Sequence, residues 1–100
     1  MRKIVLFCAA GMSTSLLVNK MKDAAKKDNY EVDINAYPVS EAKTLGSGAD
    51  IILLGPQVRF ELNKVKADCP HCPVEAIDMR AYGMMDGAAV IKHVKEVLGD

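Results

Sequence analysis

The chain has 100 residues, half of them hydrophobic, which is enough for one compact domain with a single core and too few for two. Lysine plus arginine and aspartate plus glutamate both number 13, so no net charge attracts nucleic acid or an anionic membrane surface. No apolar run approaches the roughly 18 to 20 residues of a membrane span. We therefore expect a single cytoplasmic domain over residues 1–100.

The first half of the chain predicts a strand, a helix and a second strand. Residues 3–7 (KIVLF) are continuously apolar, as in a central strand of a sheet covered on both faces. A helix of about 15 residues is expected from about Ser13, with an inward stripe of Leu17, Met21 and Ala24. Residues 30–37 (YEVDINAY) then alternate between polar and apolar, which favours an edge strand.

The middle of the chain predicts a weak helix, a strand and a second long helix. Residues 40–46 (SEAKTLG) suit a short helix that begins at Ser40. Residues 51–54 (IILL) are continuously apolar and predict another central strand. Pro56 suits a first helical turn, and the run that follows is expected to end at Cys69, with a stripe of Val58, Leu62 and Val65.

The last part of the chain predicts an edge strand and a closing helix. Residues 74–77 (VEAI) mix polar and apolar positions. Asp86 is expected to cap the last helix, which Gly99 would close, with an inward stripe of Val90, Val94, Val97 and Leu98.

These elements predict an α/β fold of three layers, in which helices cover both faces of an open four-stranded parallel sheet. The two continuously apolar strands, the first and the third, belong in its middle. Strand order 2-1-3-4 is favoured, and order 2-3-1-4 is the alternative.

The candidate site is the segment CAAGMSTS, which joins the first strand to the first helix. Ligands of open parallel sheets bind beyond the carboxyl ends of the strands where the order reverses, so Cys8 should face residues 55–57 (GPQ). Amides at a helix N-terminus stabilise a phosphate dianion and also a thiolate. We identify Cys8 as the candidate nucleophile and expect a phosphate-binding loop made of Ala9, Ala10, Gly11, Met12, Ser13, Thr14 and Ser15. The plainer alternative is a buried structural Cys8 and an ordinary N-cap at Ser13.

The loop has the length of the C-x5-R-S loop of low-molecular-weight tyrosine phosphatases, which occupies the same strand-to-helix joint. Thr14 stands where those enzymes have arginine. An arginine there clamps the transferring phosphoryl group, so its absence should impair hydrolysis. A loop that holds a phosphoryl group on sulfur without speeding its hydrolysis suits a phosphoryl carrier.

Four segments of the sequence resemble a known family. Residues 6–21 (LFCAAGMSTSLLVNKM) are similar to the phosphorylation-site segment of IIB components of the bacterial phosphoenolpyruvate-dependent sugar phosphotransferase system (PTS), lactose/cellobiose family. Residues 48–58 (GADIILLGPQV), 73–78 (PVEAID) and 82–87 (YGMMDG) also look like later segments of that family.

The resemblance implies a single EIIB-type domain with a fold similar to that of the phosphatases, and it implies a phosphotransferase. A phosphohistidine of a IIA protein would phosphorylate Cys8, and phospho-Cys8 would pass the group to a sugar carried by the membrane IIC component. The segment GMSTSLLV is more similar to cellobiose and diacetylchitobiose members of the family than to lactose members. The protein would be cytoplasmic and reach the membrane through IIC, with no cofactor and no nucleic-acid partner.

Two other functions remain open at the level of sequence. A small phosphatase or an arsenate-reductase-like enzyme could use the same loop. A thiol oxidoreductase could use Cys69 and Cys72 of CPHC, although this motif ends a helix and precedes Pro73, whereas such sites normally begin a helix. Zinc would need a fourth ligand beside Cys69, His71 and Cys72, so we expect no designed metal site.

Four further residues have weaker functional claims. Gln57 and Tyr82 fall in family-like segments and could reach the loop, or serve only as a first-turn cap and a partly buried ring. Asp78 is expected to cap or pair at the surface, and His93 to be a solvated helix residue.

Overall fold

The computed structural model describes residues 1–9 and 12–100, and of Met12 and Ser13 the backbone only. Its four strands form one parallel sheet in the order β2-β1-β3-β4, as predicted, which rules out the alternative order. The strands are β1 (Arg2–Cys8), β2 (Val32–Pro38), β3 (Ile51–Leu54) and β4 (Val74–Ala76).

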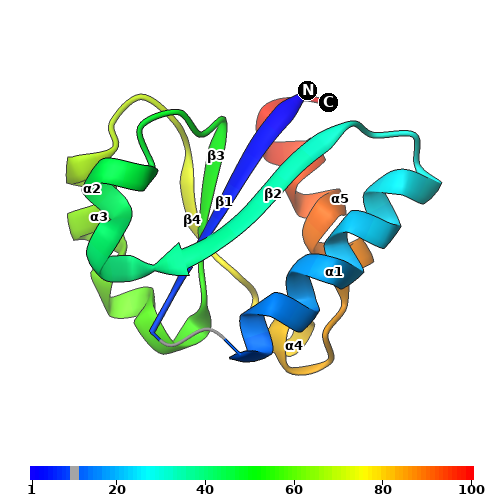
Figure 1. The fold of residues 1–100 in the computed structure, drawn as a ribbon, viewed down its shortest axis with the longest axis horizontal. Helices are drawn as coiled ribbons and strands as arrows, with labels where there is room; N and C mark the ends of the chain where they lie inside the picture. The colour runs from blue at the N-terminus through cyan, green and yellow to red at the C-terminus, as the bar shows by residue number, and fades with distance from the viewer. Residues whose placement is uncertain (10–11) are drawn as a thin grey trace.

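Helices cover both faces of this sheet, so the predicted three layers are confirmed (Figure 1). One layer consists of α1 (Met12–Lys27), α4 (Met79–Gly83) and α5 (Gly87–Leu98). The opposite layer consists of η1 (Val39–Glu41), α2 (Ala42–Leu45), η2 (Pro56–Glu61) and α3 (Leu62–Asp68). Within the described residues, no helix is both long and apolar enough to cross a membrane.

The sheet separates two hydrophobic cores, and β1 contributes to both because successive residues of a strand point to opposite faces. Ile4 and Leu6 are buried against α1 and α5, together with Leu17, Met21, Val90, Ile91 and Val94. Val5 and Phe7 are buried on the other face, together with Val58, Val65 and Val74. This double burial explains why the first strand is continuously apolar in sequence.

The predicted helix ends are confirmed where local capping decides them. The Asp86 side chain accepts a hydrogen bond from Ala89 N at 3.0 Å at the start of α5. Gly99 closes this helix with a φ of 75°, in the left-handed region that glycine adopts without steric cost.

The helix predicted from Pro56 to Cys69 is interrupted. Val58 has non-helical dihedrals (φ −120°, ψ 17°), so the run divides into the 3-10 helix η2 and the α-helix α3. Val58 is nevertheless buried, as its place in the predicted stripe required. The short helix predicted from Ser40 also begins one residue earlier, as η1 from Val39.

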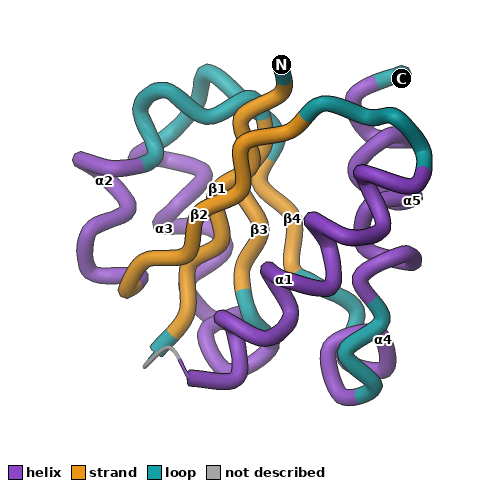
Figure 2. Tube along the Cα trace, turned by 45° about the vertical axis from the view of Figure 1, so that its right-hand side comes forward, coloured by secondary structure: helices purple, strands orange, loops and turns teal. Residues whose placement is uncertain are grey.

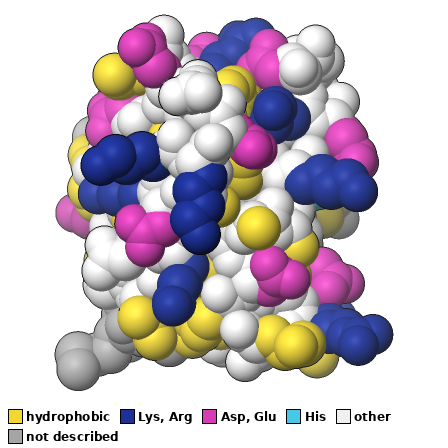
Figure 3. Space-filling model, turned by 90° about the vertical axis from the view of Figure 1, so that its right-hand side faces the viewer, with side chains coloured by type: hydrophobic (Ala, Val, Ile, Leu, Met, Phe, Trp, Pro, Cys, Tyr) yellow, Lys and Arg dark blue, Asp and Glu magenta, His cyan; other side chains and the backbone are white. Residues whose placement is uncertain are grey.

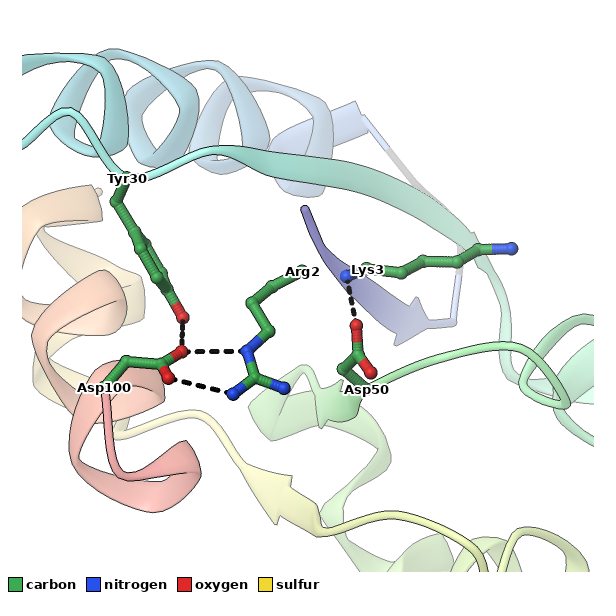
Figure 4. Close-up of polar contacts among 5 residues, drawn as sticks. All are labelled: Arg2, Lys3, Tyr30, Asp50 and Asp100. Carbon is green, nitrogen blue, oxygen red and sulfur yellow. Dashed lines mark hydrogen bonds and ion pairs between the residues drawn. The ribbon is translucent and has the colours of Figure 1, made fainter.

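The chain termini meet at the amino end of the sheet, away from the strand ends that precede α1 and α4 (Figures 1 and 2). Asp100 accepts hydrogen bonds from Arg2 Nη2 at 2.8 Å, Arg2 Nε at 2.9 Å and the Tyr30 hydroxyl at 2.5 Å (Figure 4). The Asp50 carboxylate accepts a bond of 2.7 Å from Lys3 N beside them. These contacts join β1, β3 and the C-terminus at the end of the sheet opposite Cys8.

Candidate functional site

Cys8 is the last residue of β1, where the sequence had placed it immediately after the strand. It pairs with Pro38 of β2 in the sheet register. Its side chain is 4% exposed, and Sγ lies 3.9 Å from the Tyr37 carbonyl oxygen, a long and weak thiol contact. The strand therefore fixes this sulfur at the carboxyl end of the sheet.

The segment after β3 lies beside Cys8, as the strand order predicted. Gly55 N donates a hydrogen bond of 2.9 Å to the Phe7 carbonyl oxygen, which extends the β1–β3 pairing to the strand ends. A β-carbon built on Gly55 would lie 3.7 Å from Cys8 Cβ and 3.0 Å from Gln57 Oε1. Gln57 is exposed, so its amide lies at the surface next to the strand end that carries the thiol.

The predicted loop is partly described. Ala9 is exposed, and Ala10 and Gly11 lie outside the described residues. Helix α1 begins at Met12, one residue before the predicted start, and the side chains of Met12 and Ser13 are likewise not described. The N–H groups of the first three residues of a helix have no intrahelical acceptor, so those of residues 12–14 are candidate donors to an anion beside Cys8.

Thr14, at the position of the phosphatase arginine, is 2% exposed. Among the residues that the structure describes, it is the one polar residue that is buried. Its Oγ1 lies 3.2 Å from the Tyr82 hydroxyl oxygen, within hydrogen-bond distance. Tyr82 is itself buried, more deeply than the sequence suggested. Ser15, the next loop residue, is exposed.

Tyr82 reaches α1 from α4, the helix that follows β4. Asp78 caps α4 by accepting a hydrogen bond from Ala81 N at 3.0 Å, which confirms the capping role predicted for it. Ile77 N in turn donates a bond of 2.8 Å to the Leu54 carbonyl oxygen. The ends of β3 and β4 thus determine where α4, and with it the Tyr82 hydroxyl, lies.

The CPHC segment packs against the short helix α2. Cys69 is buried, with Sγ 3.4 Å from the Ala42 carbonyl oxygen, and His71 Nε2 lies 3.0 Å from the Gly46 carbonyl oxygen. Burial raises the pKa of Cys69, and chiefly burial raises that of Cys72 to about 11. Both thiols therefore stay protonated at neutral pH, which disfavours a reactive dithiol and fits the loop at a helix end.

Acidic and histidine side chains do not assemble a metal centre in the part of the chain that the structure describes. His93 is exposed on α5, as predicted, with Nε2 3.1 Å from Glu75 Oε1. The sequence offered no local signal for the Thr14–Tyr82 contact, because the two residues lie 68 positions apart.

Comparison with known proteins identifies the family. The family model described as "PTS system, Lactose/Cellobiose specific IIB subunit" matches residues 3–93. The chain belongs to this family. It is a IIB component of the sugar phosphotransferase system, of the lactose/cellobiose type, and the resemblance seen in the sequence is confirmed.

Curated relatives of this IIB family member differ in the sugar that their names give. The oligo-beta-mannoside-specific EIIB component of Bacillus subtilis (strain 168) is 50% identical over 90 residues, covering 87% of this chain and 86% of the relative. The galactose-specific EIIB component of Lactococcus lactis subsp. cremoris (strain MG1363) and the cellobiose-specific EIIB component of Lactococcus lactis subsp. lactis (strain IL1403) are each 40% identical over 102 residues. Each match covers 95% of this chain and 94% of the relative.

Solved structures of IIB components share the fold. The lactose-specific IIB component domain of Streptococcus pneumoniae superposes with a TM-score of 0.82 at 22% identity and covers 96% of each chain. The cellobiose-specific IIB component of Borrelia burgdorferi superposes with a TM-score of 0.79 at 32% identity, covering 98% of this chain and 92% of that one. The predicted architecture is therefore that of IIB domains.

Proposed function

We propose that this IIB component carries a phosphoryl group on Cys8, accepting it from a phosphohistidine of a IIA protein and donating it to a sugar bound to a membrane IIC component. The observation that supports this most directly is the position of Cys8 in a IIB family member. Its sulfur lies at the carboxyl end of β1, beside Gly55 and four residues before the start of α1.

The proposed chemistry consists of two displacements at phosphorus. In the first, the Cys8 thiolate attacks, the S–P bond forms, the N–P bond of the donor histidine breaks, and the imidazole nitrogen keeps the electron pair. In the second, a sugar hydroxyl oxygen attacks, the O–P bond forms, the S–P bond breaks, and the sulfur regains its negative charge. The hydroxyl proton leaves to water or to a base in the sugar site. The helix amides stabilise the negative phosphoryl oxygens in both steps.

The residue at position 14 supports a carrier rather than a hydrolase. A guanidinium group would offer two charge-assisted hydrogen bonds to the phosphoryl oxygens, whereas threonine offers one neutral hydroxyl. In this chain that hydroxyl is buried and 3.2 Å from the Tyr82 hydroxyl. Attack of water on phosphocysteine therefore lacks the positive charge that phosphatases provide.

The surface around this end of the sheet supports a protein partner. Four large hydrophobic side chains are exposed in segments that directly follow β1, β3 and β4, namely Leu16, Phe60, Met79 and Met84. Figure 3 shows hydrophobic side chains along the lower edge of the α1 and α5 face, the edge where α4 lies in Figure 1. Arg59 Nη1 lies 3.4 Å from Met79 Sδ, so side chains of η2 and α4 touch at this surface. Exposed apolar groups of this kind mark protein interaction sites.

The sugar is proposed to be an oligosaccharide of the cellobiose or diacetylchitobiose type. The names of relatives at 40–50% identity already include an oligo-β-mannoside, cellobiose and galactose. We place sugar selection in IIC, and we propose that the protein works in the cytoplasm and meets the membrane only through that component.

The test is phosphorylation followed by intact mass measurement. The protein is incubated with phosphoenolpyruvate, the general relay proteins and a IIA protein of the lactose/cellobiose type, and one added phosphoryl group is expected. The group should be absent from Cys8→Ser and Cys8→Ala. The matched control is the double variant Cys69→Ser, Cys72→Ser, which should be phosphorylated normally. Phosphorylation of Cys8→Ala would contradict the assignment.

The same preparation separates the competing functions. A phosphatase or arsenate-reductase-like enzyme would turn over an aryl phosphate or arsenate, and we expect neither activity. A thiol oxidoreductase would reduce insulin and lose that activity in Cys69→Ser, Cys72→Ser. We expect no insulin reduction by the parent protein, because both thiols are held protonated by burial.

A further inference from the structure

The contact between Thr14 and Tyr82 joins the two segments that flank the proposed phosphoryl site. Thr14 is the third residue of α1, in the helical turn that follows the end of β1 in the chain. Tyr82 lies in α4, which follows the far edge strand of the sheet. Both side chains are buried and their hydroxyl oxygens are 3.2 Å apart, so this contact is shielded from water.

Among the described side chains at the start of α1, that of Thr14 is buried, whereas those of Ser15 and Leu16 are exposed. The apolar anchors of α1, Leu17 and Met21, lie one and two turns further along and fix the body of the helix. Leu16 is exposed and does not anchor the helix. Of the described side chains, the buried Thr14 therefore attaches this turn to the rest of the fold, through its contact with Tyr82.

The position of the Tyr82 hydroxyl is itself determined by the strand ends. The bond from Ile77 N to the Leu54 carbonyl oxygen fixes the exit of β4, and the Asp78 cap starts α4 immediately afterwards. Tyr82 lies one turn further and is packed in the core that also buries α1. The contact between the Thr14 and Tyr82 hydroxyl groups thus couples the carboxyl ends of β3 and β4 to the first turn of α1.

We propose that Tyr82 is a positioning residue for phosphoryl transfer. Through Thr14 Oγ1 it holds the N-terminal amides of α1 at the distance from Cys8 Sγ that an in-line transfer requires. This inference rests on the proposed function and adds to it the contact that positions the first turn of α1. Tyr82 acts through Thr14 and the helix amides and does not touch the phosphoryl group.

The physical reason is that amide donors accelerate transfer only when they are preorganised around the transferring group. Loss of one neutral hydrogen bond that maintains this geometry is expected to slow transfer about five- to tenfold. The docking surface of the IIA protein is unchanged, so the concentration of donor at half-maximal rate should stay the same. A merely structural role would lower thermal stability without this separation of the two kinetic constants.

The experiment compares Tyr82→Phe with the parent protein in rapid-quench phosphorylation by phosphorylated IIA protein. The hydroxyl is removed and the buried ring is retained. We expect the transfer rate at saturating donor to fall about five- to tenfold with an unchanged half-saturating concentration. Thr14→Val should behave in the same way, whereas Thr14→Ser, which keeps the hydroxyl, should restore most of the rate.

The double variant gives the sharper test. If the two hydroxyl groups act through each other, Tyr82→Phe added to Thr14→Val should cause no further loss. Multiplication of the two single effects would overturn the proposal. The matched control is Tyr30→Phe, which removes a hydrogen-bonded tyrosine hydroxyl at the opposite end of the sheet and should leave the transfer rate unchanged.

The possible outcomes distinguish this inference from the proposed function. If the parent protein is not phosphorylated on Cys8, the proposed function fails. If the parent is phosphorylated and Tyr82→Phe transfers at the normal rate, the positioning role alone is overturned. If Tyr82→Phe does not fold, Thr14→Val and Thr14→Ser decide the question, and equal rates in these two variants overturn the proposal.

Discussion

Gly87→Ala should destabilise the protein, because Gly87 of α5 packs directly against the backbone of α1. A β-carbon at this position would lie 2.3 Å from the backbone carbon of Lys20, 2.5 Å from its carbonyl oxygen and 2.5 Å from Met21 N. Ordinary contacts of a β-carbon lie at 3.4–4 Å. The atoms in the way belong to the backbone of a helix, so no side chain can rotate to make room. The two helices must therefore separate by about 1 Å at this point.

The expected cost follows from two opposing effects. Overpacking a well-packed interior typically costs about 1–3 kcal/mol. Alanine gains up to about 1 kcal/mol over glycine inside a helix, and Gly87 is only the first residue of α5, where the gain is smaller. We expect a net loss of about 1–2 kcal/mol in the free energy of unfolding, with a fall in melting temperature of about 4–8 °C for each kcal/mol.

The assay is urea denaturation of Gly87→Ala followed by circular dichroism, with Gly83→Ala as the matched control. A β-carbon on Gly83, at the end of α4, has no heavy atom within 4 Å, so this variant should be neutral or more stable by about 0.4–1 kcal/mol. Equal stability of Gly87→Ala and the parent protein would contradict the close approach of α1 and α5 at this residue.

Three further predictions concern the remaining thiols, alkaline pH and docking. At neutral pH, iodoacetamide should label Cys69 and Cys72 far more slowly in the native protein than in urea, because burial holds both thiols protonated. Mass spectrometry after digestion measures the labelling of each cysteine. Fast labelling of Cys69 in the native protein would contradict its burial. Burial and the bond to Asp100 raise the pKa of Tyr30 from 10.0 to about 12, so the phenol stabilises the fold fully below pH 10 and progressively less as the pH rises toward 12. Tyr30→Phe should therefore lose less stability than the parent between these two pH values in urea denaturation, and an equal loss would rule out this linkage. Phe60→Ser should raise the half-saturating concentration of phosphorylated IIA protein about fivefold or more, because it removes an apolar contact from the proposed docking surface. The melting temperature should not fall, because Phe60 is 79% exposed. Unchanged kinetics would exclude Phe60 from the docking surface.

Much of the fold could be predicted from the sequence because its signals are local. The continuous apolar run of β1, the alternation in β2 and the Asp86 cap each involve only a few neighbouring residues, and the structure confirms all three. The interruption at Val58 was not predictable in this way. Its apolar spacing fits one helix, and its dihedral angles show instead a kink that accompanies burial against the sheet.

Like the fold, the candidate site has local features that the sequence predicts and long-range contacts that it does not. The sequence by itself determined that a cysteine ends an apolar strand, that small and hydroxylated residues follow it before a helix, and that threonine occupies the position of the phosphatase arginine. These facts depend on residue order alone, and they were sufficient to indicate the family.

Only the tertiary structure decided which strands lie side by side and which distant residues meet. The first and third strands are equally apolar, so their order depends on how the whole sheet is covered. That order brings Gly55 beside Cys8 and carries Tyr82 to Thr14, 68 residues away, and the closing helix carries Asp100 to Arg2, 98 residues away. Such pairs leave no local pattern, because their partners come together only when the elements pack.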